Sequence, residues 1–215
     1  MDSRWILKGL VESVLLVGSI LLALAVDEWT QNREYAELAD QSLGTFEREI
    51  RQNRERLQGE APYHMGIRDL LGQMRSMPES RMEIASILEG LTPPVLLDTA
   101  WETALATGAL THMEFEVVSA LSLTYSIQED FESRIRSNRP RITASQNIQP
   151  GEAGVQLDEA YEYVSTLSEG ESELIAVYEQ ALEMIGLHRM TDQVDAASDS
   201  TVSGAGSPRR SGAVR

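Results

Sequence analysis

The hydrophobic pattern divides the chain into an apolar start and a longer amphipathic remainder. The segment from Trp5 to Val26 reads WILKGLVESVLLVGSILLALAV, and Leu15 to Val26 carries no charge. A helix of that length, at ~1.5 Å per residue, spans ~33 Å, which matches the hydrocarbon core of a bilayer. Trp5 and Trp29 stand at its two ends, where interfacial aromatics are common. The pattern therefore predicts one transmembrane helix within residues 1–26.

Charges on either side of this span indicate its orientation. Arg4 and Lys8 precede the apolar run, whereas Asp27 and Glu28 follow it. Because basic residues favour the cytoplasmic side, the N-terminus is expected in the cytoplasm and residues 27–215 outside it.

Signal-peptide cleavage is the alternative fate of this segment. Ala23-Leu24-Ala25 has the small-x-small form of a signal-peptidase site, which would release a soluble periplasmic protein. Glu12 interrupts the apolar region that such a peptide needs, and the helical pattern runs on past Ala25. We therefore favour an anchor that is retained.

Glu12 is an ionisable residue inside the expected span and is a candidate contact for a membrane partner. The simpler interpretation is an interfacial pair with Lys8, one helical turn earlier. Ser19 and Ala23 form a small-xxx-small pair that would let a second helix approach closely. Both interpretations stay open at this point.

Beyond the span, the helical pattern continues to about Gln58 and is expected to end near Gly59 and Pro62. Its apolar positions recur at the 3-4 spacing of a coiled-coil seam. The seam, preceded by Ala36 and Ala39, consists of Leu43, Phe46, Ile50, Asn53 and Leu57. We predict a self-association surface there, with Asn53 as a polar residue that fixes register.

The remaining pattern predicts an all-α fold: the long first helix packed with about five further helices in an irregular bundle. The expected helices cover about 63–76, 80–90, 99–107, 113–137 and 155–187. Ser/Thr-x-x-Glu capping boxes at Thr99 and Thr111 favour helix starts there. The organisation is thus a span (1–26), an acidic helical domain (27–188) and a disordered tail (189–215).

The charge pattern argues against nucleic-acid binding. The net charge is −16, and residues 27–188 carry −17 of it against 0 in 1–26 and +1 in 189–215, so this domain would repel phosphates. Residues 152–188 contain no Arg or Lys, so they form a solvated acidic face or pair with basic residues of the first helix. The basic candidates for that pairing are Arg48, Arg51, Arg54 and Arg56.

A second basic group precedes the Pro-containing loop at 138–154. It consists of Arg134, Arg136, Arg139 and Arg141. A solvated linker is the simpler interpretation, and an anion or lipid-headgroup site is the alternative.

The sequence offers no catalytic constellation, and we expect no enzymatic activity, cofactor or metal. There is no cysteine, and no phosphate-binding glycine loop or nucleophile elbow occurs. The three histidines, His64, His112 and His188, lack the Glu-x-x-His spacing of a di-iron bundle, so surface or capping positions are expected for them.

The run E12-SVLLVG18-SILLALAVDEW29 resembles the anchor of a group of uncharacterised bacterial single-pass membrane proteins. The later stretch A100-WETALATGALTHM113 is similar to a second segment of that group. The resemblance implies a bacterial inner (cell) membrane and a helical ectodomain, without a reaction, cofactor or ligand.

Binding is the function that these features favour. The expected protein is a membrane-anchored helical scaffold that acts by self-association or through a membrane or periplasmic partner. The alternative is a ligand-sensing ectodomain that signals through a membrane partner, because the expected cytoplasmic part cannot hold an output module.

Overall fold

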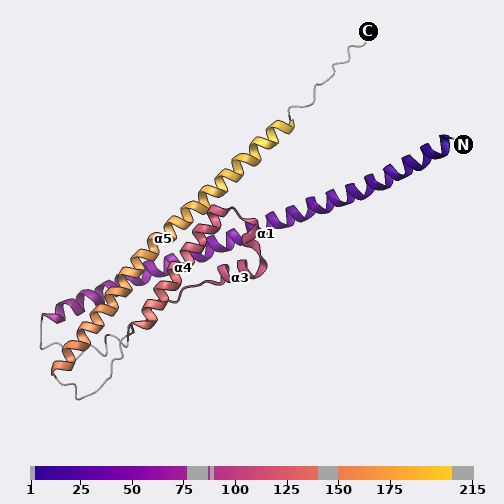
Figure 1. The fold of residues 1–215 in the computed structure, drawn as a ribbon. Helices are drawn as coiled ribbons and strands as arrows, with labels where there is room; N and C mark the ends of the chain where they lie inside the picture. The colour runs from indigo at the N-terminus through magenta and orange to yellow at the C-terminus, as the bar shows by residue number, and fades with distance from the viewer. Residues whose placement is uncertain (1–2, 77–86, 88–89, 140–149, 205–215) are drawn as a thin grey trace, which may run out of the picture.

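The computed structural model describes residues 3–76, 87, 90–139 and 150–204, with the backbone alone for 3–11, 150–153, 192 and 195–204. Within these ranges every regular element is helical, which confirms the all-α fold class. The elements are α1 (Ser3–Arg75), α3 (Thr99–Thr107), the 3₁₀ helix η2 (Ala109–His112), α4 (Phe115–Ser137) and α5 (Pro150–Gly204). The N-terminal end of α1 projects beyond the other helices (Figure 1).

Helix α1 passes through Pro62 and continues to Arg75, so the expected helix end near Gly59 and Pro62 is wrong. Proline removes one backbone hydrogen bond and disfavours a helix interior. Here Leu57 and Ala61 before Pro62, and Leu71 after it, are all buried on the inner face. Their packing outweighs the missing hydrogen bond.

Helices α1 and α5 lie antiparallel along the bundle, and α4 packs beside them (Figure 1). Two surface ion pairs mark the register of the long helices. Arg189 lies 2.6 Å from Glu47, and Arg75 lies 2.9 Å from Asp158. The apolar residues that recur at 3-4 spacing in the 113–137 and 155–187 segments form the buried faces of α4 and α5, apart from a half-buried Tyr161.

A glycine sets the closest approach between α4 and α5. Gly170 is buried, and a Cβ atom there would lie 2.4 Å from the ring of Phe131. Atoms at that distance overlap, so any larger residue would displace the ring or separate the helices.

Helix α5 extends to Gly204, so residues 189–204 of the expected disordered tail are helical. Residues 205–215 lie outside the described residues.

The expected count of five further helices is also wrong. The 63–76 segment is the end of α1, the 80–90 segment lies largely outside the described residues, and the 113–137 segment is α4 preceded by η2. Helix α3 matches its expected range and ends at Gly108, whose φ of 73° is left-handed.

Candidate functional sites: an exposed apolar helix and a buried polar layer

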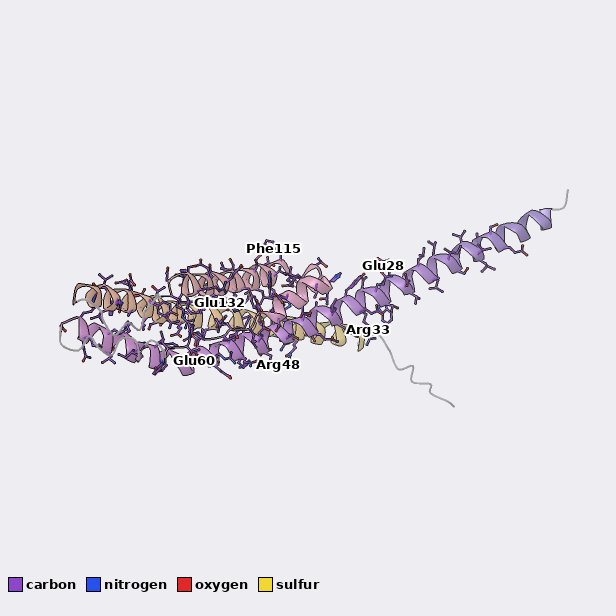
Figure 2. The ribbon with its side chains drawn as sticks, turned by 90° about the horizontal axis from the view of Figure 1, so that it is seen from below. Glu28, Arg33, Arg48, Glu60, Phe115 and Glu132 are labelled. Carbon is purple, nitrogen blue, oxygen red and sulfur yellow. The ribbon has the colours of Figure 1, made fainter. Side chains whose placement is uncertain are left out.

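Residues 12–26 of α1, here called the projecting segment, are exposed along their whole length. Their large apolar side chains, from Val14 to Val26, are between 52% and 68% exposed. The helix is long and apolar enough to cross a membrane, and none of its apolar window is buried. Figure 2 shows Glu28 and Arg33 just beyond this segment, on the part of α1 that leads out of the bundle. Arg48 and Glu60 lie within the bundle.

The expected partner contacts lie along the projecting segment. Glu12 and Ala23 are exposed. The hydroxyl of Ser19 donates to the carbonyl of Leu16 at 2.8 Å, so it is satisfied within its own helix. The side chain of Lys8 lies outside the described residues, and its pairing with Glu12 stays a prediction.

The expected self-association seam faces the interior of the same chain. Leu43, Phe46, Ile50, Asn53 and Leu57 are each no more than 4% exposed. Contacts with other elements of this chain cover them: Phe46, for example, lies against Trp101 and Tyr125. This corrects the expected role, because side chains buried within one chain leave no surface for a second copy.

Asn53 is the centre of a buried polar layer. Its amide donates to the carbonyl of Leu97 at 2.7 Å, and its side-chain oxygen accepts from the N–H of Leu97 at 2.9 Å. The Gln128 amide donates to the same carbonyl at 3.1 Å, and Tyr178 donates to the Gln128 side-chain oxygen at 2.7 Å. The layer thus ties α1, α4 and α5 to the backbone before α3.

Glu49 adds the N-terminal cap of α3. One carboxylate oxygen accepts from the Thr99 hydroxyl at 2.6 Å and from the N–H of Ala100 at 2.9 Å. The other accepts from the Tyr125 hydroxyl at 2.7 Å. Burial, and the bond to this carboxylate, raise the pKa of Tyr125, so the phenol stays a donor.

The expected capping boxes do not form. The residue that caps α3 comes from α1, and no side chain caps α3 at Asp98 or α4 at Glu114. A cap supplied from α1 fixes the position of α3 on the bundle, which a local cap would not do.

His64 and Glu171 form a second polar contact deep between α1 and α5. Their side chains are 2% and 0% exposed, and Nδ1 of His64 lies 2.6 Å from Oε1 of Glu171. Oε2 of Glu171 is buried and has no hydrogen-bond partner. The surface position expected for His64 is therefore wrong.

The other histidines lie near the projecting end. The ring of His112 stacks on Tyr35 with 3.9 Å between centroids, and Nδ1 of His188 lies 3.3 Å from Glu114. Across the described part of the chain, no group of three or more His, Asp or Glu side chains could hold a metal ion.

Among the described residues, none of the four arginines between 48 and 56 forms the expected ion pair with α5. Arg51 pairs with Glu47 of its own helix, Arg56 donates to the carbonyl of Val95, and Nε of Arg54 is buried without a hydrogen-bond partner. The actual cross-helix pairs, Arg189–Glu47 and Arg75–Asp158, lie at the two ends of the contact.

The second basic group lies at the end of α4, beside a cavity of about 310 Å³. Arg134 pairs with Asp130 at 3.1 Å, Arg136 and Arg139 line the cavity, and Arg141 is outside the described residues. The buried Tyr163 of α5 forms part of the opposite wall.

No protein-family model, curated protein or solved structure matches the chain.

Proposed function

We propose that this protein is a membrane-anchored helical bundle that binds a partner, either a second copy or another protein in or beyond the membrane. The observation that carries the proposal is the uncovered projecting segment. Each large apolar side chain gains about 1.5–3 kcal/mol when it leaves water. With nine such side chains exposed between Val14 and Val26, a lipid environment is the favoured state.

The geometry supports a bundle that follows closely on the projecting segment, because Tyr35 of α1 already stacks on His112. Residues 27–42, here called the stalk, join the projecting segment to the first buried residue, Leu43, without a helix break. At about 1.5 Å per residue the stalk is about 24 Å long. The proposed topology, with a cytoplasmic N-terminus and residues 27–215 outside the cytoplasm of a bacterial cell, rests on the flanking charges.

Self-association, in this proposal, uses the projecting segment. The seam side chains between 43 and 57 are buried by contacts within the chain. Ser19 and Ala23, in contrast, are exposed and small. Glu12, one to two turns before Ser19, would then reach a polar group of the partner helix near the membrane interface.

One experiment tests both the membrane location of the protein and the contact between projecting segments. Because the chain has no cysteine, a single Ser19→Cys substitution reports helix proximity by disulfide crosslinking in native membranes. We expect a carbonate-resistant membrane protein, digested by protease only from outside spheroplasts, that forms a Ser19→Cys crosslink. Adding Glu12→Leu should abolish the crosslink and retain insertion, whereas Glu28→Leu, outside the segment, should change neither.

An unchanged crosslink in the Glu12→Leu variant would remove Glu12 from the partner contact. Extraction of the wild-type chain by carbonate would contradict the anchor itself.

The cavity beside α4 favours ligand sensing as a second candidate function. It is lined by residues of the 93–96 segment, of α4 and of α5, so a bound molecule would contact three parts of the bundle at once. A change in their packing could reach the membrane through α1. Binding of a small molecule to the full-length protein tests this candidate.

A further inference from the structure

The cavity has apolar walls and a polar edge. Its volume of about 310 Å³ is at the lower end of the range of small-molecule sites. The apolar walls come from Pro93, Pro94, Val95, Leu96, Phe131 and Ile135. The polar edge comes from Glu132, Arg136, Arg139 and Tyr163. A compact molecule with one apolar and one polar end fits this division.

Tyr163 supplies an unused hydrogen-bond donor. The side chain is only 4% exposed, and its hydroxyl is buried without a hydrogen-bond partner. Buried polar groups nearly always have a partner, so an orphan hydroxyl in a cavity wall indicates that a ligand supplies it. Burial raises the pKa of Tyr163, so the hydroxyl remains protonated and able to donate at neutral pH.

Arg139 supplies the free positive charge. It lies close enough to Tyr163 to oppose that rise in pKa, and within the described residues it forms no ion pair. Arg136 is different, because its guanidinium lies 3.9 Å from the carboxylate of Glu132 on the same helix. The negative charge of Glu132 is thus balanced by Arg136 on the same helix. Arg139 remains available to a ligand.

We propose that this cavity binds a compact apolar carboxylate. Its apolar end would pack between Leu96, Phe131 and Ile135, and its carboxylate would accept hydrogen bonds from Arg139 and Tyr163. The inference rests on the second proposed function, ligand sensing, and does not depend on the membrane anchor. It also gives a role to the basic residues that follow α4.

The test uses three probes of similar shape and different charge. Full-length protein in nanodiscs of neutral lipid is titrated with phenylacetate, 2-phenylethanol and phenethylamine, with empty nanodiscs as the reference. Isothermal titration calorimetry should show phenylacetate binding at least about tenfold more tightly than either other probe, because charge-assisted hydrogen bonds are the stronger ones.

Variants place the binding in this cavity. Arg139→Gln should weaken phenylacetate binding about tenfold and Tyr163→Phe about fivefold, through loss of one hydrogen bond each. Arg51→Gln, on the outer face of α1, should leave the affinity unchanged. Circular dichroism confirms that each variant retains its helices.

The outcomes separate the ligand class from the sensing function. Equal or tighter binding of 2-phenylethanol, sensitive to Tyr163→Phe, would overturn the carboxylate and retain a ligand site. Binding of phenylacetate that neither variant weakens would overturn this cavity as the site. Failure of all three probes to bind would overturn the inference and remove the support for sensing.

Discussion

The two ends of α1 belong to one uninterrupted helix and have opposite surroundings. Residues 12–26 are predominantly apolar around the helix, and all of them are exposed in the described structure. Residues 43–75 are apolar on one stripe only, and that stripe is buried mainly against α5, with Tyr125 of α4 in contact with Phe46. The helix is continuous because both environments are compatible with the same backbone; the distribution of apolar residues around the axis decides which one each end occupies.

The comparison teaches that the part of α1 able to cross a membrane is separate from the part that forms the core. The projecting segment contributes no contacts to the core. Substitutions there should therefore alter membrane attachment without unfolding the bundle. The 43–75 part contributes much of the core and should behave in the opposite way.

The largest effect is expected from charges in the projecting segment. Leu16→Arg with Leu21→Arg places two arginines in the span, each costing about 2.5–3.5 kcal/mol of insertion free energy. Carbonate extraction should release the variant from membranes, while its bundle keeps the wild-type unfolding temperature. A matched charge on the bundle part, Leu70→Arg at an exposed position, should leave insertion intact. Release of the Leu70→Arg variant as well would mean that the bundle itself contributes to membrane attachment.

The next effect concerns the buried contact in the 43–75 part. His64→Ala leaves Glu171 buried without its partner, and we expect the free energy of unfolding to fall by about 3–5 kcal/mol. Replacing both residues by leucine should cost much less, because no buried polar group is left without a partner. Urea denaturation followed by circular dichroism measures both. Equal losses in the single and double variants would contradict the pairing.

The smallest effect sharpens the contrast between packed and bare helix surfaces. Gly170→Ala inserts a methyl group against the Phe131 ring and should lower the stability by about 1–3 kcal/mol. Gly66→Ala lies on an exposed face of α1 with no atom within 4 Å, and should raise it by up to about 1 kcal/mol. Thermal unfolding of the pair provides the measurement. If Gly170→Ala were neutral, α4 and α5 would have to separate easily at that point.

The sequence predicted the helices better than their ends. The 3-4 spacing identified the buried faces of α4 and α5, because packing in a bundle follows that periodicity. It failed at Pro62, where a local rule was given more weight than the pattern on either side. Continued past Pro62, the same spacing passes from Leu57 through Glu60 to His64, Ile67 and Leu71.

The buried polar residues carried a signal that was not used. Glu171 occupies the position between Leu167 and Leu174 in the 3-4 series of α5. His64 occupies the corresponding position between Glu60 and Ile67 in the series of α1. A polar residue at a seam position on each of two packed helices suggests that the two meet. Glu49 had no such signal, because its role depends on where α3 begins in space. The same limit applies to the cavity, since Tyr163 and Arg139 are brought together only by the packing of α4 on α5.

Because α1 is one continuous helix, a tilt at its N-terminal end would displace the far end of the bundle. From Val17, in the middle of the projecting segment, to Arg75 the helix runs for about 87 Å. A change of about 10° in the tilt of the span would swing the far end of the bundle sideways by about 15 Å, and tilts of that size are ordinary for membrane helices. A neighbour that altered the local thickness of the bilayer would thereby change how far across the membrane surface this bundle can reach.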